Sequence, residues 1–312
     1  MALRILFCGT PEFAVPSLRA LLAAPDISIE AVITQPDRPR GRGQEMSSPP
    51  VKEVALAAGL HVFQPEKIRG ESSQEFISKV QPDAIVIIAY GQIIPARLLG
   101  IPRLGWINVH ASRLPKYRGA APIQWAIVNG ESRTGVTTMR IDAGLDTGPT
   151  LETTELEIGA DETAPELSRR LAEAGAPLIV STLGKLERGE VVAQPQDNSL
   201  ASLARPLKKE DGQTDWSLTA QQIYNRIRGL DPWPGVFTTF RGHAMQFWGK
   251  PASIEERSEP GLIRASHGKV VVACGGGTWL EISEVKLEGR KRMAARDFAN
   301  GARLLPDEKL GV

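Results

Sequence analysis

Short apolar runs alternate with helical patterns along the N-terminal part of the chain. The runs at 3–8, 27–34 and 84–89 predict buried strands, and residues 51–58 and 72–80 repeat their apolar positions with helical spacing. Strands that alternate with helices at this interval predict a parallel sheet. We therefore expect an α/β fold class, with a Rossmann-like, mostly parallel sheet and helices on both faces.

The turn after the first predicted strand sets the geometry of that sheet. Thr10 is expected to cap a helix whose first residue is Pro11. No glycine-rich phosphate fingerprint follows the strand, which weakens a nucleotide-cofactor interpretation. In open α/β sheets the ligand crevice lies beyond the carboxyl ends of the strands. The segments expected to border it are Gly9-Thr10, the loop after Thr34, Tyr90-Gly91 and the loop at His110.

The pattern of strands and helices continues to about residue 186 and then changes. Residues 134–141 predict another strand, and 167–186 predict a helix interrupted near Pro177. The chain then becomes polar and irregular, so we expect a catalytic domain at 1–194, a linker at 195–215 and a second domain at 216–312. Short alternating segments set off by turns predict a C-terminal small β-barrel (OB-like) domain. These segments are residues 236–240, 244–248, 261–265, 269–273 and 278–285.

Composition narrows the class of protein. A chain of 312 residues with 42% hydrophobic residues is long for one core, which favours two domains. No apolar run approaches the roughly 20 residues of a membrane-spanning helix, and the N-terminus lacks the flanks of a signal peptide, so we expect a cytoplasmic protein. Residues 1–204 carry a balance of −3 and residues 205–312 a balance of +4. That asymmetry favours a polyanion near the C-terminal part only weakly, and a merely soluble surface explains it as well.

Residues 105–119 form the stretch with the clearest chemistry. In an extended chain Ile107 and Val109 can face a core while Asn108 and His110 share the opposite face. An amide donor beside an imidazole, where a strand opens into a loop, suits the binding of an oxyanion and the movement of protons. The alternative is that both side chains only cap loop carbonyls.

A second loop, at residues 142–148, supplies carboxylates. Two glycines allow the backbone to turn tightly there, and either Asp142 or Asp146 could approach His110. A carboxylate beside an imidazole fixes its orientation and favours its charged form. The alternative is a turn in which Asp146 bonds its own backbone.

Two basic segments are candidates for phosphate contacts. The loop at 35–50 carries Arg38, Arg40 and Arg42 among prolines and glycines. Its composition suits gripping phosphates, and a surface loop with solvated arginines is equally compatible. Arg290, Lys291 and Arg292 form a cluster that could meet a phosphate backbone or simply be solvated.

Taken together, these motifs make the chain resemble methionyl-tRNA formyltransferases over nearly its whole length. The motifs that carry the resemblance are Phe7-Cys8-Gly9-Thr10-Pro11, Thr34-Gln35-Pro36-Asp37-Arg38-Pro39, Ala89-Tyr90-Gly91, Asn108-Val109-His110-Ala111-Ser112, Arg118-Gly119-Ala120-Ala121-Pro122, Gly144-Leu145-Asp146-Thr147-Gly148, Lys209-Glu210-Asp211 and Asp231-Pro232-Trp233-Pro234. The Asn-x-His and Asp-Thr-Gly motifs are common to folate-dependent formyltransferases, so they indicate the reaction. The arginine-rich loop and the second domain indicate the substrate.

The resemblance implies an enzyme in which 10-formyltetrahydrofolate donates the formyl group to the α-amine of methionyl initiator tRNA. Asn108 and His110, with Asp146, would stabilise the oxygen of a tetrahedral intermediate, and no metal would be required. Folate would lie along Ser112, Arg113, Leu114 and Pro115 and beside Tyr90 and Gly91. The tRNA would meet Arg38, Arg40 and Arg42 and the C-terminal domain with Arg290, Lys291 and Arg292. The protein is expected to be a monomer without a membrane partner.

Two positions depart from the family pattern. Arg113 stands where the family usually has a leucine, and Leu203 stands where a tyrosine is common before the linker. Two other functions stay open at this point: a formyltransferase acting on an amino-sugar nucleotide, and a non-catalytic RNA-binding relative. The arginine-rich loop argues against the first and the presence of Asn108, His110 and Asp146 against the second.

Overall fold

The computed structural model describes residues 2–40 and 45–311. The chain divides into two compact units, and each is described here by itself. The first comprises Met1–Pro122, Arg133–Glu157 and Leu167–Arg205, and the second Ile123–Ser132, Ile158–Glu166 and Pro206–Val312. The domain limits 1–194, 195–215 and 216–312 stay a prediction.

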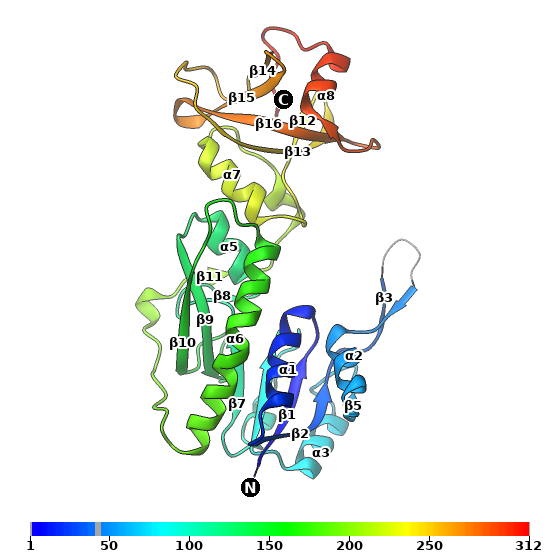
Figure 1. Ribbon diagram of the computed structural model, residues 1–312, viewed down its shortest axis with the longest axis vertical. Helices are drawn as coiled ribbons and strands as arrows, with labels where there is room; N and C mark the ends of the chain where they lie inside the picture. Colours follow the sequence, from blue (N-terminus) through cyan, green and yellow to red (C-terminus); the bar gives the residue numbers. More distant parts are fainter. Residues whose placement is uncertain (1, 41–44, 312) are drawn as a thin grey trace. The chain divides into compact units, whose positions relative to one another are not determined.

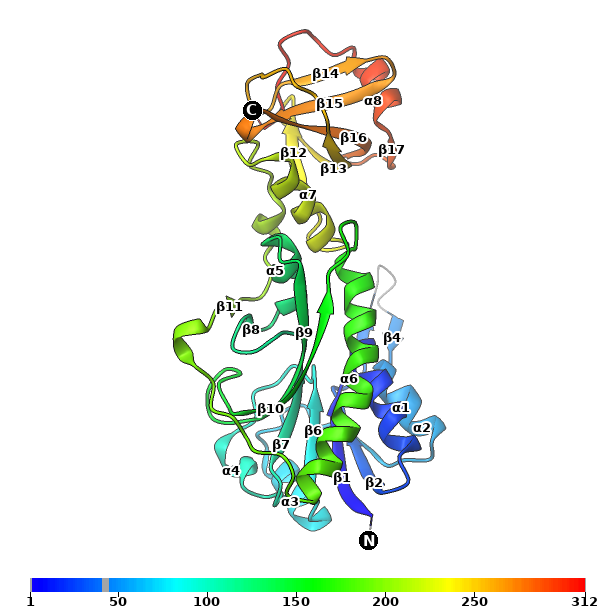
Figure 2. The same cartoon turned by 60° about the vertical axis from the view of Figure 1, so that its left-hand side comes forward.

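The first unit is built on a seven-stranded sheet in the order β10-β9-β7-β6-β1-β2-β5 (Figures 1 and 2). Five neighbouring strands are parallel, β9 pairs antiparallel with β7, and β10 pairs antiparallel with β9 at the edge of the sheet. The Rossmann-like, mostly parallel sheet is therefore confirmed. The strands are β1 (Leu3–Gly9), β2 (Ile27–Ile33), β5 (Val62–Phe63), β6 (Ala84–Ile88), β7 (Trp106–His110), β9 (Arg133–Arg140) and β10 (Thr150–Glu157).

Helices cover both faces of this sheet (Figures 1 and 2). Leu6, Ile85 and Trp106 belong to a buried cluster with residues of α3 and α4, because alternate strand positions point to one face. On the other face Gly175 of α6 approaches Val109 so closely that an added Cβ would lie 3.0 Å from its methyl group. The helices are α1 (Val15–Ala23), preceded by the 3-10 turn η1 (Glu12–Ala14), α2 (Pro50–Ala57), α3 (Glu71–Val80), α4 (Ala96–Leu99) and α6 (Ala164–Glu187).

The turns at the carboxyl ends of β1, β2 and β6 are hydrogen-bonded to one another. Thr10 Oγ1 donates to the Tyr90 carbonyl at 3.2 Å and accepts from the Gln35 backbone N–H at 3.4 Å. Gln35 Nε2 donates to the same carbonyl at 3.1 Å. The prediction that Thr10 caps a helix is wrong, since η1 follows Pro11 and the threonine hydroxyl is used to join these turns instead.

The predicted break near Pro177 is also wrong, because α6 continues through it. Pro177 is exposed, as is Glu173 one turn earlier, whose carbonyl receives no N–H from the proline. Leu171, Ile179 and Leu183 are fully buried, and their apolar face holds the helix on the sheet.

The segment that follows α6 packs on the first unit before the chain enters the second. Its strand β11 (Leu203–Ala204) pairs in parallel with β8 (Arg118–Gly119) and is preceded by η2 (Asn198–Leu200). Leu203 is 74% exposed, whereas its neighbour Ala204 is fully buried. A large aromatic side chain at 203 would therefore stand in solvent within this unit.

The second unit contains an antiparallel sheet in the order β12-β13-β16-β15-β14, with β17 beside β16. Residues of α7 and α8, among them Ile223 and Phe298, share one buried cluster with the strands. The prediction of a C-terminal β domain is confirmed. Its elements are η3 (Lys209–Gly212), β12 (Phe237–Phe240), β13 (His243–Ala252), β14 (Ile263–Ser266), β15 (Lys269–Cys274), η4 (Gly275–Gly277), β16 (Thr278–Leu287), β17 (Met293–Ala294), α5 (Pro122–Val128), α7 (Ala220–Gly229) and α8 (Ala295–Ala302).

Candidate active site

Strand β7 carries Asn108 and His110 to the carboxyl edge of the sheet. The strand is held between β6 and β9, with Asn108 paired to Ile87 on one side and Met139 on the other. Ile107 and Val109 are buried, as the alternation predicts. Asn108 is partly exposed and His110 is 6% exposed, so the amide can meet a ligand more openly than the imidazole.

Asp146 completes a cluster with these two residues. Its Oδ1 lies 3.5 Å from Asn108 Nδ2 and its Oδ2 lies 3.6 Å from His110 Nδ1. Oδ2 also accepts the backbone N–H of Gly119 at 2.8 Å. The structure therefore brings together the three residues that the sequence analysis selected, and a backbone N–H that it did not.

Asp142, the other carboxylate of the loop, has a local structural contact. Its Oδ1 accepts from the Gly144 backbone N–H at 3.0 Å and from Thr147 Oγ1 at 2.7 Å. Asp142 thus makes the kind of turn contact that was the alternative for Asp146. Asp146 itself has a left-handed backbone with φ of 51°, an uncommon conformation for a residue with a side chain.

The second ring nitrogen of His110 sets its tautomer. Nε2 lies 2.9 Å from the carbonyl oxygen of Tyr117. A carbonyl can only accept, so Nε2 carries a proton and donates it. Nδ1 is then the nitrogen that faces Asp146 and can exchange a proton with a ligand.

The segment after His110 is fixed to β9 and β10. Thr137 Oγ1 donates to the Ser112 carbonyl at 2.8 Å, and Ser112 Oγ donates to the Lys116 carbonyl at 2.6 Å. Arg113 forms an ion pair with Glu155 at 2.6 Å and packs over Gly135, where its Cγ would lie 2.9 Å from an added Cβ. The arginine that departs from the family pattern is thus paired within the first unit. Leu114 is joined to Pro115 by a cis peptide bond.

Tyr90 and Gly91 follow β6 at the neighbouring position of the same edge. The Tyr90 side chain is 2% exposed and lies in the cluster with Cys8 and Trp106, where burial raises the pKa of its hydroxyl. Within the described residues its hydroxyl has no hydrogen-bond partner. Only the Tyr90 backbone therefore takes part in the hydrogen bonds at the edge, and the chain turns at Gly91, whose φ of 89° is left-handed.

Two family descriptions match the chain. One described as "Formyl transferase" matches residues 3–183, and one described as "Formyl transferase, C-terminal domain" matches residues 206–303. The methionyl-tRNA formyltransferase of Solibacter usitatus is 54% identical over 310 residues, 99% of both chains. That of Acidobacterium capsulatum is 52% identical over 319 residues, covering 99% of this chain and all of the relative. The chain belongs to the methionyl-tRNA formyltransferase family.

Solved structures of lower identity share the fold. The sugar 3N-formyl transferase WlaRD, whose structure was determined with dTDP and 5-N-formyl-THF, has a TM-score of 0.68 at 18% identity and covers 93% of this chain and 100% of its own. HypX from Aquifex aeolicus in complex with tetrahydrofolic acid has a TM-score of 0.61 at 16% identity, covering 96% of this chain and 47% of its own. A formyltransferase fold thus occurs with more than one acceptor among these proteins.

The arginine-rich loop of this family member contains a β-hairpin. β3 (Arg38–Arg40) pairs antiparallel with β4 (Glu45–Ser47). Arg38 is exposed and lies 3.2 Å from Glu66, and Arg42 lies outside the described residues. At the base of the hairpin Lys52 lies 2.7 Å from Asp37, and its hydrogen bond lowers the pKa of that carboxyl.

The basic cluster of the second unit lies on the turn after β16. Arg290 and Lys291 are exposed. Arg292 forms an ion pair with Glu284, and its guanidinium lies 3.8 Å from the centre of the Trp248 ring. Arg292 is thus held to the sheet surface, so Arg290 and Lys291 are the better candidates for phosphate contacts.

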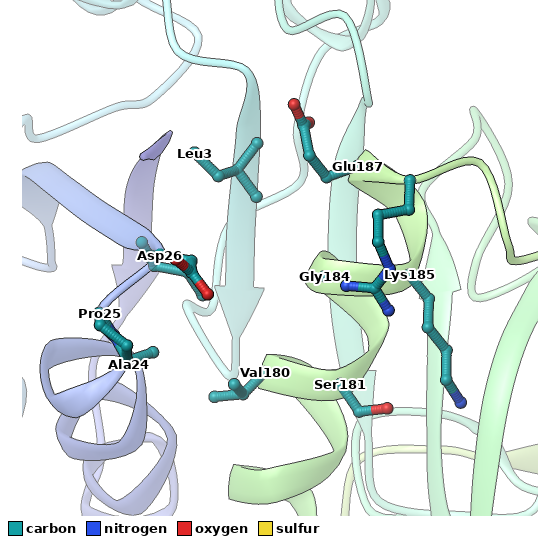
Figure 3. A pocket seen from close by; sticks show the side chains of 11 residues that line it. Leu3, Ala24, Pro25, Asp26, Val180, Ser181, Gly184, Lys185 and Glu187 are labelled. Atoms are coloured by element: carbon teal, nitrogen blue, oxygen red, sulfur yellow. The ribbon is translucent and has the colours of Figure 1, made fainter. Parts of the chain in front are cut away.

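A cavity of about 460 Å³ lies at the opposite end of the first unit's sheet (Figure 3). It is lined by the start of β1, the turn after α1 and the end of α6, including Leu3, Asp26 and Gly184. Three of its charged residues form ion pairs, Lys185 with Glu152, Glu187 with Arg103 and Arg188 with Glu190. This cavity is at the amino ends of β1 and β2, away from Asn108 and His110.

Residues 2–40 and 45–311 contain no group of three or more His, Cys, Asp or Glu side chains placed to hold a metal ion. No helix in this part of the chain is long and apolar enough to cross a membrane.

Proposed function

We propose that this chain transfers the formyl group of 10-formyltetrahydrofolate to the α-amine of methionyl initiator tRNA. The observation that carries the proposal is the meeting of Asn108, His110 and Asp146 at the carboxyl edge of a parallel sheet. Full-length relatives at about half identity, named as methionyl-tRNA formyltransferases, support this acceptor. A cytoplasmic, monomeric enzyme accords with this activity.

The proposed reaction is an acyl transfer through a tetrahedral intermediate. The amine nitrogen attacks the formyl carbon, the carbonyl π electrons move to its oxygen, and the bond to N10 of the folate then breaks. Asn108 Nδ2 donates to the oxygen as negative charge develops, an interaction worth about 3–4 kcal/mol at similar sites. His110 Nδ1, held beside Asp146, relays the proton that leaves the amine and reaches N10.

The substrate contacts follow the carboxyl edge of the sheet. We assign the folate to Ser112, Arg113, Leu114 and Pro115 and to the backbone at Tyr90 and Gly91. Thr137 and Thr10 support this assignment, because their hydroxyls tie these two segments to neighbouring strands. The scheme uses no metal ion.

The tRNA contacts are assigned to two basic surfaces. Arg38, Arg40 and Arg42 belong to the loop at residues 35–50, in which β3 pairs with β4 and Lys52 contacts Asp37. Arg290, Lys291 and Arg292 lie on the turn after β16. Cationic side chains on a hairpin and a turn suit contacts with phosphates, which give affinity rather than base specificity.

The test compares three formyl acceptors with a single formyl donor. Purified protein is supplied with 10-formyltetrahydrofolate and methionyl initiator tRNA, methionyl elongator tRNA or an amino-sugar nucleotide, and formyl transfer is followed. We expect rapid transfer to the initiator tRNA alone. Transfer only to the sugar nucleotide would replace this function with the second candidate, and transfer to none would leave an RNA-binding role.

A variant at His110 separates binding from chemistry. His110→Ala should abolish turnover, since the proton relay is lost, while initiator tRNA affinity stays near that of the wild type.

Arg42→Ala should weaken use of the tRNA and leave the fold intact. Unchanged tRNA kinetics in Arg42→Ala would remove the loop at residues 35–50 from the proposed interface.

A further inference from the structure

Gln196 contacts the candidate site from a segment that neither family description matches. The first match ends at residue 183 and the second begins at residue 206. We propose that Gln196 is a positioning residue for formyl transfer, which fixes the backbone that carries Asp146. The inference rests on the function proposed above. Gln196 Nε2 donates to the carbonyl of Asp146 at 2.8 Å and to that of Gly148 at 2.6 Å.

Arg118 fixes the orientation of the Gln196 amide. Its Nε and Nη2 both donate to Gln196 Oε1, at 2.9 and 2.8 Å, and Nη2 also donates to Asn198 Oδ1 at 2.9 Å. A guanidinium has only donors, so the oxygen of the amide must face Arg118 and the nitrogen must face the two carbonyls. Arg118 is 6% exposed, which shields these hydrogen bonds from competing water.

The backbone of Asp146 needs such support. With φ of 51° it has a conformation that side-chain-bearing residues adopt only where the surroundings hold it. The two hydrogen bonds from Gln196 reach the carbonyls of the residues before and after Thr147, and they hold the backbone of this turn in place. They leave the Asp146 carboxylate facing His110 Nδ1 at 3.6 Å and the Gly119 N–H at 2.8 Å.

Strand β8 contacts both Gln196 and Asp146. β8 contributes Arg118 to Gln196 and, one residue later, the Gly119 N–H to the Asp146 carboxylate. β8 is in turn paired with β11. That strand ends at Ala204, eight residues after Gln196 in the chain. The backbone and the carboxylate of Asp146 are thus fixed from a single short strand.

Gln196→Glu tests the donor groups specifically. The variant keeps one oxygen for Arg118, loses both N–H groups, and places its second carboxylate oxygen against the carbonyls of Asp146 and Gly148. We expect kcat for initiator tRNA to fall on the order of 10- to 100-fold, since small displacements of reacting groups have effects of this size. KM for both substrates should change by less than about threefold, because the substrate contacts are intact.

Asn198→Ala is the matched control. Asn198 accepts from the same guanidinium and makes no hydrogen bond to Asp146 or Gly148, so the kcat of this variant should stay near that of the wild type. Gln196→Met, which removes the amide without adding a charge, gives a second route if the glutamate variant does not fold. It should show the same loss of kcat.

A double-mutant cycle with Asp146→Ala distinguishes positioning from general destabilisation. If Gln196 acts through Asp146, Gln196→Glu should lower kcat no further in the Asp146→Ala background. Equal losses in both backgrounds, or wild-type kcat in Gln196→Glu or Gln196→Met, would overturn the inference while the wild-type enzyme still formylates initiator tRNA. A wild-type enzyme without that activity would overturn the proposed function instead.

Discussion

The amide of Asn108 is partly exposed at the candidate site, and its contact with Asp146 at 3.5 Å is at the limit of a hydrogen bond. Asn108→Ala should therefore change the free energy of unfolding little and remove a donor to the developing oxyanion. We expect kcat to fall about 100- to 1000-fold. Steady-state formylation and urea unfolding measure the two effects. A kcat within about threefold of wild type would exclude Asn108 from the oxyanion site.

The two cysteines are expected to be inert in the folded protein. Cys8 lies in β1 with no exposed surface, and burial raises the pKa of its thiol well above the usual range. Burial also raises the pKa of Cys274 to about 12. Because the thiolate is the reactive form, iodoacetamide at about pH 8 should leave both unmodified in the native protein and modify both in concentrated urea. Mass spectrometry gives the number of adducts, and rapid native labelling would contradict the buried positions.

Single residues show which parts of the site a sequence can predict. Asn108 and His110 have distinctive side chains at the end of a strand, which made them candidates, whereas the choice of Asp146 over Asp142 came from the family resemblance. The Tyr117 carbonyl and the Gly119 N–H bind the same side chains through the backbone, which has no residue-type signal. Gln196 was missed because 50 residues separate it from Asp146 and only the tertiary fold brings them together.

Among the elements, strand β10 was not predicted from the sequence, although it contacts the segment that follows His110. Its residues Thr150–Glu157 alternate between partly buried and exposed at the edge of the sheet, so their threonines and glutamates resemble a polar loop in the sequence. Without β10 the sequence offers no partner for Arg113, which the structure pairs with Glu155. The central strand β6 was predicted within one residue because all five of its residues are buried and apolar.

The turn that carries Asp146 leaves no room for a side chain at Gly148. An added Cβ there would lie 1.9 Å from the carbonyl oxygen of Arg140 at the end of β9. Gly148→Ala must therefore displace the loop or the strand end, and we expect it to reduce both kcat and the free energy of unfolding, the latter by about 2 kcal/mol. Activity and urea unfolding measure the two losses.

Gly100→Ala is the control for that substitution. Gly100 ends α4 with φ of −87°, and nothing lies within 4 Å of its added Cβ. Its stability and activity should match those of the wild type. If Gly148→Ala were equally silent, the close approach of the loop to Arg140 would be wrong.

On the scale of the whole molecule, the second unit consists of three separate stretches of chain. A division of the sequence at one linker does not predict this composition. Tyr224 Oη donates to Asp161 at 2.5 Å, and the buried Arg228 donates to the carbonyls of Gly159 and Glu162. Residues 158–166 thus satisfy polar groups of α7. The sequence shows the composition change near residue 195, but these contacts are between residues more than 60 positions apart.

The positive balance of the C-terminal part gives the last prediction, which concerns the tRNA. Arg290 and Lys291 are exposed on the turn after β16. Replacing both with alanine should weaken initiator tRNA binding and lower the slope of log affinity against log salt by about 2, since each phosphate contact contributes about one unit. kcat at saturating tRNA should be unchanged, because the reacting groups lie in the other unit. Lys79→Ala, at the exposed end of α3, is the charge control. An equal effect of Lys79→Ala would mean that net charge, and not this turn, attracts the tRNA.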